Sequence, residues 1–88
     1  MTTRSKCYTL ARMLGCELEY NWRRHSRQAE IYLPEGMKVA GTLDVDALHH
    51  ECKLDEDIWP GVYADLQMLE GGMEPLDLDD RGVTDENP

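Results

Sequence analysis

Two short runs of alternating apolar and polar residues, separated by a polar loop, constrain the fold of this chain more than any other feature. A period of two residues is typical of a strand with one buried face. Only the five polar residues 23–27 lie between the runs, so together they predict an antiparallel hairpin. The apolar positions are Cys16, Leu18, Tyr20 and Trp22 in the first run and Ala29, Ile31 and Leu33 in the second.

A helical period is found on both sides of this hairpin. Before it, Ser5 is a suitable N-cap and Gly15 a suitable C-terminal stop, which predicts a helix of about ten residues. After it, Asp57 can cap a second helix that has Pro60 in its first turn and ends at Gly71. The apolar faces are Cys7, Leu10, Ala11 and Leu14 in the first helix and Trp59, Val62, Leu66 and Leu69 in the second.

The segment between the hairpin and the last helix is expected to hold a third strand and a short helix. A third alternating run covers residues 37–45, and Gly41 within it suggests a bulge or a break. Asp46 can cap a helix through Cys52, because Leu48 and Cys52 stand four residues apart. The predicted order is α-β-β-β-α-α, a small α+β domain with a three-stranded antiparallel sheet and helices packed on one face.

The chain has 88 residues, enough for a single hydrophobic core. Residues 70–88 contain seven acidic residues, three Gly and two Pro, with few apolar side chains to offset the entropy of ordering them. The sequence therefore predicts a compact domain over residues 1–69 and a flexible acidic tail over residues 70–88.

Charge is distributed unevenly along the chain. Residues 1–28 contain six basic and two acidic residues, whereas residues 29–88 contain three basic and sixteen acidic residues, for a net charge of −9. An acidic surface can replace phosphates and bind a basic, nucleic-acid-binding protein, as an inhibitor or accessory protein of the mobile-element type does. This role requires that the hairpin arginines do not fold back onto the acids. The expected contact patch is Asp44, Asp46, Asp55, Glu56 and Asp57.

An alternative function is nucleic-acid binding by the arginine-rich hairpin. Guanidinium groups bind phosphates, and neighbouring aromatic rings can stack on bases. The net charge of −9 opposes binding to a polyanion, so this hypothesis is second to the acidic one. Its candidate residues are Tyr20, Trp22, Arg23, Arg24 and Arg27.

The sequence offers no recognisable catalytic, cofactor or metal motif, and we expect a binding protein rather than an enzyme. The cysteines Cys7, Cys16 and Cys52 and the histidines lack the paired spacing of a zinc site. Three unpaired cysteines and the absence of a signal-like or membrane-spanning run favour a reducing cytoplasm. A three-stranded sheet also has an exposed edge strand, through which two copies can pair across a two-fold axis.

Overall fold

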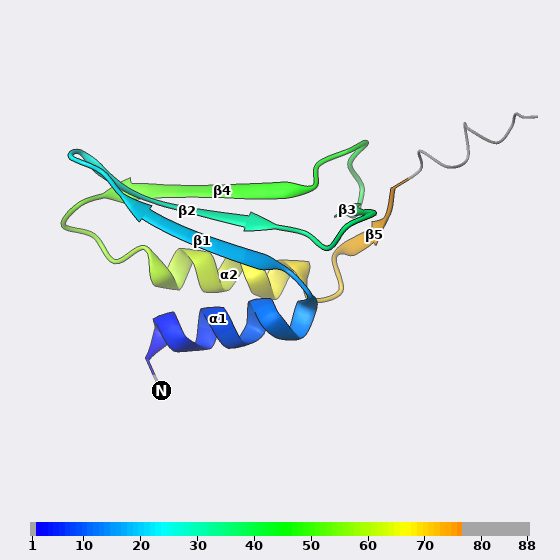
Figure 1. Ribbon diagram of the computed structural model, residues 1–88, viewed down its shortest axis with the longest axis horizontal. Helices are drawn as coiled ribbons and strands as arrows, with labels where there is room; N and C mark the ends of the chain where they lie inside the picture. Colours follow the sequence, from blue (N-terminus) through cyan, green and yellow to red (C-terminus); the bar gives the residue numbers. More distant parts are fainter. Residues whose placement is uncertain (1, 77–88) are drawn as a thin grey trace, which may run out of the picture.

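The computed structural model describes residues 2–76 of the chain. It is a small α+β domain with two helices, a three-stranded antiparallel sheet in the order β1-β2-β4, and a separate two-stranded pairing of β3 with β5 (Figure 1). The predicted fold class and the three-stranded antiparallel sheet are thus confirmed. The elements are α1 (Thr3–Leu14), β1 (Glu17–Trp22), β2 (Ser26–Tyr32), β3 (Met37–Val39), β4 (Ala47–Lys53), α2 (Trp59–Leu69) and β5 (Met73–Pro75).

The predicted hairpin is formed by β1 and β2. Their ladder runs without interruption from Glu17 opposite Tyr32 to Trp22 opposite Arg27. A backbone hydrogen bond from the Arg23 N–H to the Ser26 carbonyl, 2.7 Å long, closes the turn. Alternation in the sequence therefore predicted the antiparallel hairpin, but β2 begins at Ser26, inside the loop predicted over residues 23–27.

The prediction of a helix over residues 46–52 is wrong, because this segment is β4, the third strand of the main sheet. It pairs antiparallel with β2 along its whole length, from Ala47 opposite Tyr32 to Lys53 opposite Ser26. Leu48 and Cys52 lie on one face of a strand as well as on one face of a helix, so their spacing fits both structures. Asp46 does not cap a helix; its carbonyl accepts a hydrogen bond from the Leu33 N–H.

The third strand expected over residues 37–45 is correspondingly short. Only Met37–Val39 form β3, which lies outside the three-stranded sheet and pairs with β5. Gly41 has a φ of +86°, a left-handed conformation that ends the extended run, as expected for a break at this position. The observed order of elements is therefore α-β-β-β-β-α-β rather than α-β-β-β-α-α.

Both helices lie on the same side of the three-stranded sheet, as predicted, and pack against each other (Figure 1). The core between them is apolar, with Ile31 of β2 against Val62 and Leu66 of α2, all at most 1% exposed. α1 begins earlier than predicted, since Thr2, rather than Ser5, is its N-cap and accepts a hydrogen bond from the Ser5 N–H. The N-cap of α2 is Ile58 rather than Asp57 as predicted, although the Asp57 carboxylate, one residue earlier, accepts a hydrogen bond from the Trp59 N–H at 3.2 Å.

The first residues of the expected tail are part of the folded structure. β5 pairs with β3, and its Glu74 carboxylate contacts Lys38, the one charged side chain among residues 2–76 that is buried. The Lys38 ammonium donates to Glu74 Oε2 at 2.5 Å and to the Thr42 carbonyl, and the Gly41 N–H donates to the same carboxylate. The rest of the expected tail, residues 77–88, lies outside the described residues.

Candidate functional site

The outer face of the three-stranded sheet carries most of the polar side chains that the three strands display. The ladders align the outward positions of β1, β2 and β4 in three rows across the sheet. We call these nine positions the outer grid. Its rows are Glu17-Tyr32-Ala47, Glu19-Glu30-His49 and Asn21-Gln28-Glu51.

Four of the nine grid positions are carboxylates, and none is Lys or Arg. Glu17, Glu19, Glu30 and Glu51 come from all three strands, and all reach solvent. Lys53 lies opposite Ser26, just beyond one end of the grid. The outer face is therefore negatively charged, whereas the inner face packs its apolar residues against the helices.

Hydrogen bonds link the centre of the outer grid. His49 contacts Glu30 Oε2 through Nδ1 at 3.1 Å and Glu51 Oε1 through Nε2 at 3.4 Å. The Tyr32 hydroxyl donates to Glu30 Oε1 at 2.5 Å, and the Gln28 amide donates to Glu51 Oε2 at 3.2 Å. These contacts hold the central carboxylates in fixed positions on the sheet.

The same contacts displace the pKa values of the central groups. Hydrogen bonds from Tyr32 and His49 lower the pKa of Glu30, and hydrogen bonds from Ser26, Gln28 and His49 lower that of Glu51. The bond to Glu30 raises the pKa of His49, and a bond to the same carboxylate raises that of Tyr32 to about 12. At neutral pH the two glutamates are therefore ionised, and His49 is the group whose charge varies.

The hairpin arginines do not fold back onto these acids. Over residues 2–76, the ion pairs closer than 4 Å involve only Lys38, His49 and His50 as cations. Arg27 instead donates to the Leu54 carbonyl through Nε at 2.8 Å and to the Tyr20 hydroxyl through Nη1 at 2.7 Å. Within residues 2–76, none of the ion pairs on this face involves Arg23, Arg24 or Arg27.

Some of the candidate nucleic-acid-binding residues of the hairpin are exposed, and others are bonded within the domain. Tyr20 faces the helices and packs on Trp59, with ring centroids 4.9 Å apart, and the Arg4 guanidinium lies over both rings. Trp22 was expected on the buried phase of its strand, yet it is 67% exposed. Trp22, Arg23 and Arg24 are thus accessible, whereas Tyr20 and Arg27 are bonded within the domain.

The residues of the expected acidic patch lie at opposite ends of β4. Asp44 and Asp46 precede the strand and Asp55, Glu56 and Asp57 follow it. Seven strand residues span roughly 23 Å, so the two groups do not form one cluster. Two members also have local structural roles, since Asp57 accepts from the Trp59 N–H and Glu56 from the Lys53 N–H.

The cysteines do not have the character of activated nucleophiles. Burial raises the pKa of Cys7 to about 11 and also raises those of Cys16 and Cys52. All three thiols are free. Within the described part of the chain, no group of three or more His, Cys, Asp or Glu side chains is arranged to hold a metal ion.

His50 and Asp65 form a separate polar pair on the helix side of the sheet. Their side chains meet at 3.1 Å, and each is about one-third exposed. Gly61 of α2 lies directly against the imidazole, because a Cβ at this position would come within 2.2 Å of His50 Nε2. The pair joins β4 to α2 and is explained by packing.

Comparisons with known proteins leave the outer grid as the principal guide to function. No protein-family model matches the chain, and neither curated proteins nor solved structures include a significant match. Neither helix in the described region is long and apolar enough to cross a bilayer.

Proposed function

We propose that this chain is a protein-binding module that presents the outer grid to a basic, nucleic-acid-binding partner. The observation that carries the proposal is the set of four carboxylates on one face of the sheet, none of which forms an ion pair with a hairpin arginine of the same chain. By occupying the partner's basic groove, the module acts as an inhibitor or accessory protein in place of nucleic acid.

The regular spacing of the grid suits this role. Neighbouring strands lie about 4.8 Å apart, and successive outward residues on one strand lie about 6.7 Å apart. The carboxylates of Glu17, Glu19, Glu30 and Glu51 are therefore repeated in two directions on a rigid backbone. Arginine side chains of a partner can bind such carboxylates with two parallel hydrogen bonds each. Less entropy is lost on binding at Glu30 and Glu51, whose carboxylates already accept hydrogen bonds from neighbouring side chains.

The net charge of −9 supports the same proposal through association kinetics. A strong negative field attracts a basic partner over long distances and raises the rate of encounter. Asp44 and Asp46 at one end of β4, and Asp55, Glu56 and Asp57 at the other, extend this field beyond the grid. In this proposal they are peripheral contacts rather than the centre of the interface.

Three free cysteines support a cytoplasmic location, which we include in the proposal. A reducing compartment keeps thiols unpaired, and Cys7, Cys16 and Cys52 form no disulfide. The proposal also assigns binding rather than catalysis to the chain, because the pKa of each thiol is raised and the grid carboxylates are solvated.

The test compares the grid with an equal number of charges elsewhere. One variant carries Glu17→Gln, Glu19→Gln, Glu30→Gln and Glu51→Gln, and the matched control carries four substitutions outside the grid and its peripheral contacts, Glu35→Gln, Glu70→Gln, Asp77→Asn and Asp79→Asn. Immobilised chains are offered the heparin-binding fraction of a cell lysate, with elution by salt and by duplex DNA. The grid variant is expected to lose the proteins that DNA displaces, and the control to keep most of them.

Equal losses from the two variants would show that only net charge matters and would contradict a role for the grid. A gel-shift measurement with labelled single-stranded and duplex DNA separates the alternative function. We expect no shift with the unmodified chain. A shift that is lost in a variant with Arg23→Ala and Arg24→Ala would favour direct nucleic-acid binding by the hairpin instead. Far-UV circular dichroism checks that every variant is folded.

A further inference from the structure

The outer edge of β1 has a regular row of backbone groups that bond to no other backbone segment within residues 2–76. β1 is a terminal strand of the sheet, and hydrogen-bonded pairs alternate along its ladder with β2. Counting from the bonded pair Arg23 and Ser26, the backbone groups of Leu18, Tyr20 and Trp22 point away from β2. No backbone segment in residues 2–76 outside the β1–β2 ladder bonds to these three residues.

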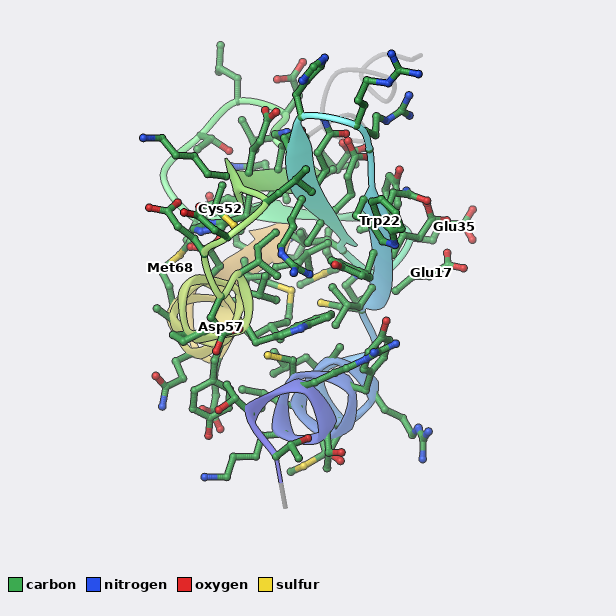
Figure 2. The ribbon with its side chains drawn as sticks, turned by 90° about the vertical axis from the view of Figure 1, so that its left-hand side faces the viewer. Glu17, Trp22, Glu35, Cys52, Asp57 and Met68 are labelled. Atoms are coloured by element: carbon green, nitrogen blue, oxygen red, sulfur yellow. The ribbon has the colours of Figure 1, made fainter. Side chains whose placement is uncertain are left out.

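This edge lacks several of the features that usually prevent strands from pairing. β1 contains no Pro, no Lys and no bulge, and its ladder with β2 is continuous. Its last residue, Trp22, is 67% exposed, an unusual position for the largest apolar side chain. Figure 2 shows Trp22 and Glu17 on the side of the molecule that β1 borders.

Charge at the edge is arranged so that an antiparallel copy complements it. Glu17 and Glu19 lie at the start of β1, whereas Arg23 and Arg24 follow its end, and all four are exposed. Two strands that run in opposite directions place the acidic start of each beside the basic end of the other. The same arrangement opposes parallel pairing, which would bring like charges together.

We propose that two copies of the chain join through β1, antiparallel, around a two-fold axis at Tyr20, to form one six-stranded sheet. Because the free backbone groups belong to even-numbered residues, even positions must face even positions across the interface. Centring on Tyr20 places Leu18 opposite Trp22 of the second copy and Glu17 opposite Arg23 of the second copy. Symmetry repeats both contacts, so each is made twice.

Neighbouring registers are less favourable. Centring on Glu19 would set two glutamates directly opposite each other, which destabilises a strand pair. Centring on Asn21 would shorten the overlap of the two strands to residues 20–22. The register at Tyr20 keeps residues 18–22 in the ladder and places the exposed Trp22 against an apolar neighbour on the helix side of the sheet.

The first experiment measures the mass of the full chain by analytical ultracentrifugation over a range of concentrations. The expected result is a species with twice the 10.1 kDa mass of one chain. Its dissociation constant is then compared with the dissociation constants of the variants. Glu17→Arg and Arg23→Glu should each weaken the dimer about tenfold, because two symmetric attractions become repulsions. The double variant should recover the original dissociation constant.

This rescue is specific to the proposed pairing. Within one copy Glu17 and Arg23 lie at opposite ends of β1 and form no ion pair, so their charges cannot compensate each other internally. A monomer at all concentrations, or a dimer that these three variants leave unchanged, would overturn the proposal. The latter result would point to the β4 edge or to the helices.

A backbone variant provides an independent readout. Trp22→Pro removes an N–H that points away from β2, so it should abolish the dimer while leaving the β1–β2 ladder intact. Trp22→Thr retains the N–H and should weaken the dimer less. Hydrogen exchange of the unmodified chain should protect the Leu18 and Tyr20 amides only at concentrations where the dimer forms. Protection that does not depend on concentration would contradict the proposed interface.

Discussion

Polar side chains on the two sides of the sheet have different surroundings. On the helix side and in the adjoining β3–β5 pair, Lys38 and Arg27 donate hydrogen bonds to backbone carbonyls and to single polar partners. On the outer face, Glu30, His49 and Glu51 contact one another while exposing 40% or more of their side chains. A buried polar group must be paired to avoid a desolvation cost, whereas a solvated one contributes little to stability and is available to a partner.

The largest expected effect follows from breaking the Lys38 pair. Glu74→Ala leaves the Lys38 ammonium buried without its counter-charge, and we expect a larger loss in the free energy of unfolding than from Arg27→Ala. Lys38→Met should cost less, because methionine fills a similar volume and the half-exposed Glu74 can be hydrated. Urea denaturation measures both. An equal loss in the two variants would show that the burial of the charge is unimportant.

An intermediate effect is expected at Arg27, which connects β2 to Leu54 and Tyr20. Arg27→Ala removes two hydrogen bonds from a charged donor, and the expected loss is about 2 kcal/mol. Arg24→Ala is the matched control, because Arg24 is exposed in the hairpin turn and should change stability by less than about 0.5 kcal/mol. Thermal or urea unfolding followed by circular dichroism compares them. Equal losses of stability in the two variants would show that the hydrogen bonds of Arg27 contribute no more to stability than the exposed Arg24 side chain does.

The smallest effect is a displaced titration on the outer face. The pKa of His49 is raised, so His49 gains its proton at a higher pH than a free imidazole does. Its contribution to stability is complete below pH 6.5 and is lost as the pH rises through the raised pKa. In an NMR titration, Glu30→Gln should return the His49 pKa toward 6.5, whereas Glu17→Gln should leave it nearly unchanged. An unaffected pKa in Glu30→Gln would exclude Glu30 as the principal cause.

Protonation of His49 also reduces the negative charge of the grid. The proposed function therefore predicts weaker binding of a basic partner as the pH falls through the His49 pKa, within the range where Glu30 and Glu51 remain ionised. Binding is thus expected to weaken as the pH falls, whereas the contribution of His49 to stability increases.

Sequence patterns predicted the elements whose apolar period is unambiguous. The alternation in β1 and β2 and the helical stripe of α2 each allow one structure, and all three elements are present, although β2 and α2 begin at residues other than those predicted. β4 was mistaken for a helix because its inward position His50 is polar and hides the period of two. His50 faces inward because it bonds to Asp65 and lies against Gly61, two α2 residues distant in sequence.

Only part of the outer grid could be predicted from the sequence, because β4 was predicted to be a helix. Glu17, Glu19 and Glu30 occupy the polar phase of two correctly predicted strands, so the alternation already placed them on one face. Glu51 and His49 lie on the same face because residues 47–53 form a strand, whereas the sequence pattern predicted a helix over residues 46–52. The acidic patch predicted from Asp44 to Asp57 relied on closeness along the chain, but an extended strand separates its two halves.

The pairing of Lys38 with Glu74 has a consequence for the order in which the protein forms. The two residues are 36 positions apart, and synthesis proceeds from the N-terminus. Until the ribosome has added Glu74, Lys38 lacks its counter-charge and is more stable in water than in the interior. The corner of the domain formed by β3 and β5 therefore cannot be completed before Glu74 has been added.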